Sequence, residues 1–153
     1  MPKNGNGIRL TASVIIPKGR YFWFVQGKED GHWAFPGGKL ILSPYETFYH
    51  AARRESSEEL GLHVDVSPEA VRIYQFRNSN NHPTVNITFQ GEIEGEPKIT
   101  KPQEIRDIKR FKLEEIERMN RRHELRYGRV YLAMLNDYKS GSRIPAEFIR
   151  YFR

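Results

Sequence analysis

The chain contains no cysteine, which excludes disulfide bonds and thiolate zinc sites. It also lacks an apolar run long enough to span a membrane, and residues 1–6 are polar where a signal peptide would be apolar. Its five histidines show no pairwise spacing typical of a metal site, so we interpret them as ordinary surface or edge residues. These features predict a cytoplasmic protein that does not bind a membrane.

Length and composition fit one folded domain over residues 1–153. The chain is 38% hydrophobic, and a chain of this length buries roughly two thirds of its unfolded surface. We find no linker and no internal repeat. Alternating apolar residues indicate α+β composition, with strands over residues 8–16, 20–27, 71–76, 85–93 and 108–113 and helices over residues 114–119, 124–138 and 146–152. The first two strands are expected to form a hairpin around residues 17–19.

Positive charge is concentrated in the last third of the chain. Residues 1–100 hold 11 Lys and Arg against 11 Asp and Glu, whereas residues 101–153 hold 14 against 8. Arginines in this region could attract a polyphosphate or RNA by long-range electrostatics: Arg118, Arg121, Arg122, Arg126 and Arg129. A solvated basic surface explains the same charges and is favoured. The aromatic residues interleaved with them are interpreted as core or interface residues.

Three glutamates near the end of a predicted helix are the most informative feature. Glu55, Glu58 and Glu59 stand at positions i, i+3 and i+4, so their carboxylates share one helix face. Unpaired acids at a helix C-terminus are disfavoured by the helix dipole, and like charges four residues apart repel. A divalent cation would relieve both costs. The alternative is a solvated acidic face in which Arg54 pairs with Glu58 at i, i+4.

The beginning and end of this helix also have sequence signals. Ser43 is predicted to be the N-cap, Pro44 the first helical residue and Glu46 the partner in an S-x-x-E capping box. Gly61 is expected to end the helix in the left-handed conformation.

A short apolar segment precedes the helix. Residues 33–35 are predicted to form a buried strand that runs into a turn at Gly37 and Gly38, where the backbone can approach a ligand closely because glycine has no Cβ. Lys39 follows the glycines and could contact phosphate. A strand, a glycine loop and an acidic helix together suggest a scaffold that holds a metal ion against a phosphate chain.

The segment from Gly38 to Leu62 resembles the Nudix hydrolase signature, G-x5-E-x7-R-E-U-x-E-E-x-G-U with U aliphatic. From Glu46 onward every spacing fits, and the match includes Arg54, the three acids described above, Gly61 and Leu62. There are two departures. Seven residues separate Gly38 from Glu46 where the signature has five, and Ser56 occupies an aliphatic position. Neither departure removes a carboxylate.

The resemblance implies both a fold and a reaction. It implies an α/β/α sandwich with a mixed β-sheet, in which the signature helix covers one side and a second helix the other. It also implies hydrolysis of the diphosphate linkage in a nucleoside diphosphate joined to another moiety, by attack of water on phosphorus. Mg²⁺ is the implied cofactor, with Mn²⁺ as a substitute, because such sites use oxygen ligands.

Residue roles follow from the same resemblance, position by position. Glu55, Glu58 and Glu59 resemble the metal ligands, and the carbonyl of Gly38 resembles a further ligand. Arg54 resembles the residue that orients a signature glutamate through a salt bridge without touching the substrate.

The resemblance leaves alternatives for the general base and for the substrate contacts. Glu104 resembles a loop glutamate that joins the site in many family members, and Glu55 is the alternative base. Besides Lys39, Arg77 begins a polar loop, residues 77–83, that could select the substrate. We find no marker of a particular nucleotide derivative.

Two other functions stay open. The same fold could serve as a nucleotide sensor without catalysis, which the complete set of acids argues against. The basic last third could instead recognise an RNA 5′ end, which is not favoured over a small nucleotide derivative. The sequence also leaves open assembly into a homodimer.

Overall fold

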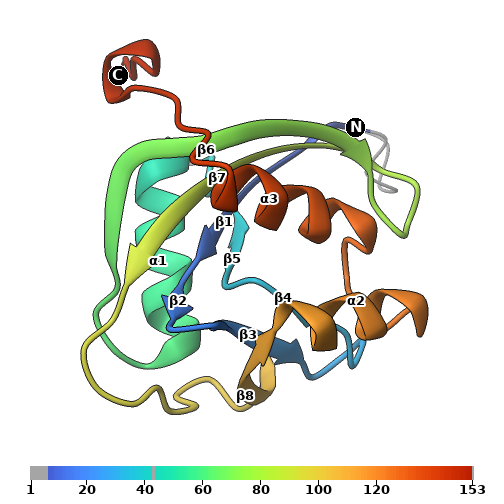
Figure 1. Cartoon of the computed structure of the whole chain (residues 1–153). Coiled ribbons are helices and arrows are strands. Elements are labelled where there is room, and N and C mark those ends of the chain that lie inside the picture. The colour runs from blue at the N-terminus through green and yellow to red at the C-terminus, as the bar shows by residue number, and fades with distance from the viewer. Residues whose placement is uncertain (1–6, 43, 153) are drawn as a thin grey trace.

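The computed structural model describes residues 7–42 and 44–152. In this part of the chain, two four-stranded sheets are combined with helices α1 (Phe48–Leu60), α2 (Leu113–Arg121) and α3 (Arg129–Lys139). Figure 1 shows the first sheet between α1 on one side and α3 on the other. The predicted α+β sandwich with a mixed sheet is therefore confirmed, and the strands divide between a mixed sheet and an antiparallel one.

The mixed sheet has the strand order β5-β1-β7-β6. Its strands are β1 (Arg9–Ile15), β5 (Gly37–Lys39), β6 (Asp65–Arg77) and β7 (Pro83–Glu92). Strand β1 runs parallel to β7, and the other two pairings are antiparallel. The short β5 therefore forms one edge of the sheet, beside α1.

The antiparallel sheet is built around one central strand, β3 (Tyr21–Gly27). It pairs along one edge with the two-residue strands β2 (Pro17–Lys18) and β4 (Trp33–Ala34) and along the other with β8 (Ile105–Lys112). Figure 1 shows this sheet below the mixed sheet, with α2 beside it.

The apolar residues form two cores on opposite sides of the mixed sheet. Ala12 and Val14 of β1 belong to the core under α1, where Ala51 and Ala52 are fully buried. Ile15 belongs to the other core, under α2 and α3. The alternation along β1 thus gives each face of the strand its own helix layer.

The predicted hairpin between the first two strands is wrong. β1 and β3 lie in different sheets, and only the short β2 pairs back onto β3 through a turn at Gly19, which has a φ of 60°. The reason is burial, since residues 11–16 are all buried and β1 occupies an interior position between β5 and β7.

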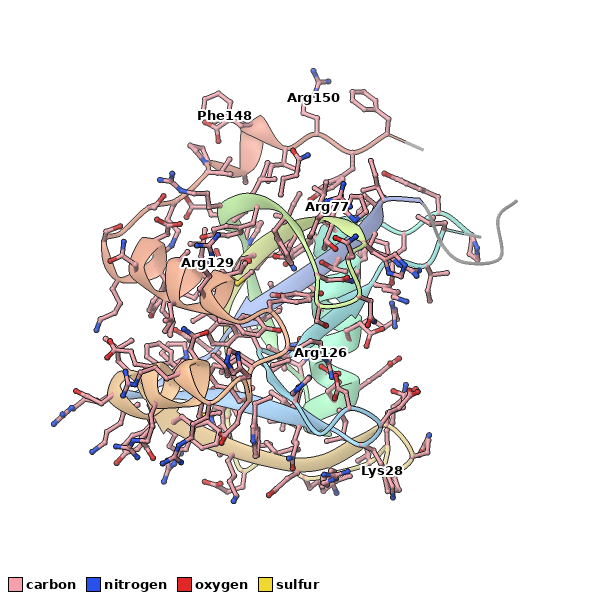
Figure 2. All side chains as sticks on the ribbon, turned by 90° about the vertical axis from the view of Figure 1, so that its right-hand side faces the viewer. Lys28, Arg77, Arg126, Arg129, Phe148 and Arg150 are labelled. Carbon is pink, nitrogen blue, oxygen red and sulfur yellow. The ribbon has the colours of Figure 1, made fainter. Side chains whose placement is uncertain are left out.

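The two predicted C-terminal helices are shorter than expected. The first begins only at Arg129, because Leu125 bridges to Trp33 of β4 and Gly128 has a φ of 56°. The second is a single 3₁₀ turn, η1 (Ala146–Phe148), and Phe148 is 74% exposed, so no core supports a longer helix. Figure 2 shows this segment projecting from the body of the molecule.

Just before η1, the C-terminal segment crosses strand β6. The amide of Ile144 donates a hydrogen bond to the carbonyl of Ala70 at 2.7 Å. Among the described residues, no helix combines the length and the apolar character needed to cross a membrane.

Candidate active site

Helix α1 begins later than the sequence predicts. Its N-cap is Thr47, whose hydroxyl accepts a hydrogen bond from the His50 amide at 3.1 Å. The predicted capping box is wrong, and Ser43 itself lies outside the described residues. Glu46 instead closes a loop ahead of the helix, since its amide donates to the Ile41 carbonyl at 2.9 Å and its carboxylate accepts from the Ile41 amide at 2.9 Å. The predicted C-terminal residue Gly61 is confirmed, with a φ of 69°.

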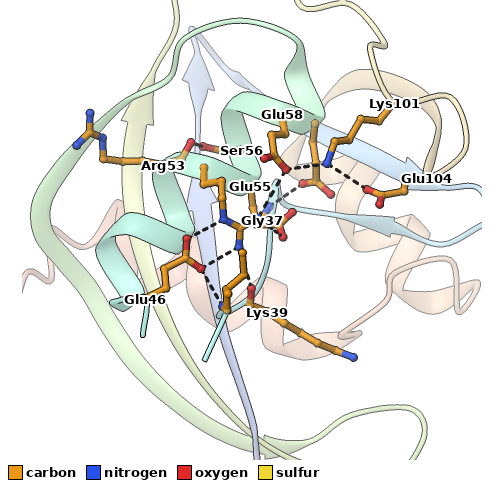
Figure 3. A network of polar contacts seen from close by, with 12 residues as sticks. Gly37, Lys39, Glu46, Arg53, Glu55, Ser56, Glu58, Lys101 and Glu104 are labelled. Carbon is orange, nitrogen blue, oxygen red and sulfur yellow. Dashed lines mark hydrogen bonds and ion pairs between the residues drawn. The ribbon is translucent and has the colours of Figure 1, made fainter. Parts of the chain in front are cut away.

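Arg54 connects this loop to the acidic face of α1 through Glu46 and Glu55, two acids that Figure 3 labels within one network of polar contacts. Its Nε and Nη2 donate to the two carboxylate oxygens of Glu46 at 2.7 and 2.9 Å, and its Nη1 donates to Glu55 Oε1 at 2.9 Å. The guanidinium hydrogen bonds hold the pKa of Glu46 below its usual range. Glu46 is thus a bidentate ion-pair partner of Arg54, the strongest geometry for such a pair.

Glu59 is the most buried of the three helix acids, with 7% of its surface exposed. Its Oε1 accepts a hydrogen bond from the Gly37 amide at 2.8 Å. Burial raises the pKa of Glu59 to about 8, although the Gly37 hydrogen bond opposes the shift. The positive charge of Arg126 also favours the ionised form of Glu59, but its effect is smaller than that of burial.

The two glycines lie in strand β5 and not in the predicted turn. A Cβ on Gly37, where φ is 151°, would lie 2.0 Å from the carbonyl oxygen of Ala12 in β1. A Cβ on Gly38 would lie 2.6 Å from Cδ of Glu55 in α1. The absence of both side chains therefore allows β5 to approach β1 on one side and the carboxylate of Glu55 on the other.

Glu58 connects the helix to the loop before β8. Its Oε2 lies 2.8 Å from Nζ of Lys101, which lies 3.9 Å from Oε2 of Glu104. Burial raises the pKa of Glu55, although Arg54 opposes the shift. The structure thus gathers the three helix acids, Arg54, Gly38 and, through Lys101, the half-exposed Glu104.

A cavity of about 270 Å³ opens beside β5. Its lining includes Gly38, Lys39 and Thr11 from the mixed sheet with Arg9 and Arg126. Lys39 is exposed, and Figure 3 shows its side chain pointing away from the carboxylates. The carbonyl of Lys39 accepts a hydrogen bond from Arg54 Nη2 at 3.2 Å. A phosphate-bearing molecule in this cavity would face three cations and Asp30, and it would be separated from Glu55 by the backbone of Gly38.

A family model described as the NUDIX domain matches residues 7–133. This chain belongs to the Nudix family. As a Nudix hydrolase it acts on pyrophosphate bonds. No curated protein sequence gives a significant match.

Solved Nudix structures share the fold. A Nudix hydrolase from Nitrosomonas europaea superposes with a TM-score of 0.79 at 23% identity, covering 95% of this chain and 98% of that one. A MutT protein from Methanosarcina mazei Go1 gives 0.69 at 20% identity, covering 88% and 95%. An Ap4A hydrolase from C. elegans gives 0.66 at 17% identity, covering 86% and 96%. At these identities the likeness concerns the fold alone.

The oxygen donors of the Nudix signature fit a hard divalent cation. Three carboxylates on one helix face lie beside a glycine backbone, and two of them are buried enough to have raised pKa values. Across residues 7–42 and 44–152, however, no three acidic or histidine side chains converge into a ready-made cluster. Instead, Arg54 contacts Glu55 and lies 3.6 Å from Glu58, Lys101 contacts Glu58, and the Gly37 amide contacts Glu59. A cation would compete with these contacts.

Beside the Nudix signature, the sequence indicated neither Asp30 nor Lys101, and it indicated Arg126 only as one of several arginines in a basic region. Nε of Arg126 lies 3.1 Å from Oδ2 of Asp30, and Nη2 of Arg126 fills the space that a Cβ on Gly27 would need. Nζ of Lys101 lies 2.8 Å from Oε2 of Glu58, a contact between residues 43 positions apart. Charge was the single signal for Arg126, because its partner is 96 residues away in the sequence.

Arg77 lies apart from the acids. It lines a neighbouring hollow of about 410 Å³, together with Arg126 and Arg129, and its Nη1 donates to the Asn81 carbonyl at 3.0 Å. The structure therefore does not bring Arg77 and the Glu cluster together, and its role as a substrate contact stays a prediction.

Proposed function

We propose that this Nudix hydrolase uses Mg²⁺ to cleave the diphosphate linkage of a nucleoside diphosphate joined to another moiety, with water attacking phosphorus. The observation that carries this proposal is the placement of Glu55 and Glu59 of α1 against the glycine strand β5, whose Gly38 also lines a cavity that presents Arg9, Lys39 and Arg126. Acids and cations side by side suit a metal ion and a phosphate chain respectively.

The proposed ligands of Mg²⁺ are Glu55, Glu58, Glu59 and the carbonyl of Gly38, and Mn²⁺ is expected to substitute. When bound, the cation would neutralise phosphate charge and lower the pKa of a water molecule that it binds. Gly38 suits the role of a metal ligand because its backbone approaches the Glu55 carboxylate closely. This approach is possible since glycine carries no Cβ.

Arg54 is proposed to be a positioning residue. Two of its nitrogens are held by Glu46, so its contact with Glu55 Oε1 has a fixed direction. Arg54 thereby restricts the rotamers of Glu55 without reaching into the cavity, whose lining does not include it. Partners that orient a metal ligand in this way tune the site strongly.

Two groups are candidates for the general base. Glu104 is 56% exposed at its side chain and is linked to the helix acids through Lys101, so it could approach a bound water. Glu55 is the alternative if it does not bind the metal ion directly. Lys39, in the cavity wall, is proposed to contact substrate phosphate as a point charge.

The test is turnover of nucleoside diphosphate derivatives with Mg²⁺ by the wild type and by Glu59→Gln. Losing a ligand removes several kcal/mol of charge stabilisation, so we expect turnover to fall by about 100-fold or more. Binding without turnover in the wild type would instead indicate a nucleotide sensor. Turnover of 5′-phosphorylated RNA alone would indicate an RNA 5′-end enzyme.

A further inference from the structure

Two hollows adjoin the cavity beside Gly38, and they differ in charge. The one that contains Arg77, Arg126 and Arg129, which we call the basic hollow, has a volume of about 410 Å³ and no Asp or Glu in its lining. The other, of about 580 Å³, contains Lys28 and Arg126 but also three carboxylates: Glu29, Asp30 and Glu104. An anion is therefore favoured in the basic hollow and disfavoured in the other.

The basic hollow adjoins the cavity that we assign to the scissile diphosphate. The two share the same wall residues, Asn78, Ser79, Arg126 and Tyr127. Figure 2 shows Arg126 at the centre of this face, with Arg77 and Arg129 above it. A chain of linked phosphates could thus pass from Gly38 into the basic hollow without leaving the protein surface.

Two of the three arginines have cationic groups available for a ligand. Neither Arg77 nor Arg129 forms an ion pair with a carboxylate in residues 7–42 and 44–152, and both side chains are exposed. Arg126 pairs with Asp30 through Nε, which leaves its terminal nitrogens outside that contact. The planar guanidinium presents several donors in a geometry that matches phosphate oxygens.

The wall of the basic hollow is held in place by backbone and aromatic contacts. The Trp33 amide donates to the Glu124 carbonyl at 2.8 Å, and the Arg126 amide donates to the Trp33 carbonyl at 2.9 Å. The ring of Tyr127 packs between Phe76 and Tyr131, with centroid distances of 4.8 and 5.1 Å. A fixed wall lowers the entropic cost of binding.

The same packing limits what the basic hollow can recognise. Because Phe76 and Tyr131 already contact the ring of Tyr127, this aromatic residue is not free to stack on a nucleobase. The loop opposite is also closed on itself, since Asn78 Oδ1 accepts from the amides of Asn80 and His82 at 3.0 and 2.9 Å. Cationic recognition therefore dominates over base stacking here.

We propose that the basic hollow is a phosphate subsite and that the preferred substrates are small nucleotides whose phosphate chain continues beyond the scissile diphosphate. This inference rests on the proposed function, which places the scissile diphosphate beside Gly38. Arg129 and Arg77 would each contact the additional phosphates, while Arg126 would lie between the two subsites.

The experiment compares two substrates that differ only in phosphate number, diadenosine tetraphosphate and diadenosine diphosphate. The variant is Arg129→Gln, and the matched control is Arg121→Gln, an exposed arginine of α2 outside the hollow. The measured quantity is kcat/KM for the tetraphosphate divided by kcat/KM for the diphosphate. We expect this ratio to fall about five- to tenfold in Arg129→Gln and to stay at the wild-type value in Arg121→Gln.

Arg129→Lys distinguishes the effect of charge from the effect of donor geometry. It also serves as a control for misfolding. It keeps the positive charge and is expected to recover part of the ratio, whereas a misfolded variant would lose turnover of both substrates together. The proposal is overturned if Arg129→Gln leaves the ratio unchanged or if the control lowers it equally. It is also overturned if the variant affects only 5′-triphosphorylated RNA.

A binding measurement distinguishes failure of the inference from failure of the proposed function. If the wild type hydrolyses neither dinucleotide, calorimetry with inorganic tripolyphosphate and pyrophosphate tests the subsite without catalysis. Weaker binding of tripolyphosphate, relative to pyrophosphate, in Arg129→Gln supports the subsite even then. Equal affinities in wild type and variant would overturn it.

Discussion

At the residue scale, the ion pair between Arg54 and Glu46 changes the interpretation of the helix start. The spacing from Ser43 to Glu46 fits a capping box, but the structure uses the Glu46 carboxylate to hold both the Ile41 amide and the Arg54 guanidinium. The side chains of Glu46 and Arg54 are only 13% and 26% exposed, so solvent screens this pair incompletely. Glu46 is therefore an ion-pair partner of Arg54 and not a helix cap.

Glu46→Gln is expected to reduce kcat by about tenfold, because an amide cannot hold the guanidinium in a bidentate ion pair and Glu55 loses its fixed orientation. KM for the nucleotide should change little, since Glu46 does not line the cavity. Steady-state kinetics measure the two constants separately.

Arg53→Gln is the control for this prediction, because Arg53 is exposed on the same helix turn. The positioning role would be wrong if Glu46→Gln raised KM and left kcat unchanged. It would also be wrong if the Arg53 variant lost as much activity.

At the element scale, the three-residue strand β5 decides how closely sheet and helix approach each other. Its pairing with β1 places Gly38 opposite Ala12 and Gly37 opposite Ser13. The amide of Gly37 is thereby directed to the carboxylate of Glu59 in α1. One short edge strand thus links the mixed sheet to the acidic face of α1.

Alanine substitutions at the two glycines should have different consequences. Gly37→Ala places a Cβ 2.0 Å from a backbone oxygen at a φ of 151°, so we expect the free energy of unfolding to fall by more than about 1 kcal/mol. Gly38→Ala meets only the Glu55 side chain, which can move. This variant should keep most of its stability and lose activity.

Urea denaturation and turnover, measured on the same preparations, check both outcomes. The control is Gly141→Ala, a glycine whose added Cβ meets nothing within 4 Å, although its φ of 82° still carries backbone strain. An active Gly38→Ala enzyme would contradict the close approach to Glu55.

At the scale of the whole molecule, segments distant in sequence meet at one end of the two sheets. Asp30 follows β3, Asn80 lies between β6 and β7, and Arg126 lies between α2 and α3, yet all three line the hollow that also contains Glu104. The acids of α1, which links β5 to β6, and cations such as Arg126 come from different parts of the chain. They are therefore brought together only when the complete domain folds.

Mg²⁺ should therefore stabilise the folded protein as well as support catalysis. A ligand that binds only the native state adds about 2.7 kcal/mol at 100 times its dissociation constant. We expect the midpoint of thermal unfolding to rise with Mg²⁺ concentration in the wild type and much less in Glu59→Gln, as measured by calorimetry without nucleotide. Equal shifts in both proteins would show that the cation binds elsewhere.

The sequence predicted features that depend on local spacing. The shared face of Glu55, Glu58 and Glu59 follows from helix geometry, and Gly61 ends α1 as expected. It could not predict which acid would hold Arg54, because Glu46 fits a cap and an ion pair equally well by spacing. The pairing of Arg126 with Asp30 is set by tertiary folding and has no local signal.

The strands illustrate the same limit. Their positions follow from apolar alternation, yet the sheet to which each belongs depends on long-range pairing. A turn at residues 17–19 predicted a hairpin between the strands on either side, whereas β1 instead pairs with β7, more than 70 residues later in the chain. Local turn signals therefore could not assign β1 to the mixed sheet.

The hydrogen bond from Ile144 to Ala70 has a consequence for self-association. Strand β6 is the outer strand of the mixed sheet opposite β5, and an open outer strand can serve as a template for another chain. The crossing segment occupies the edge at Ala70, where the register of β6 with β7 is also irregular. We therefore expect the segment around Ile144 to hinder the pairing of β6 with another chain at Ala70, apart from any part in catalysis.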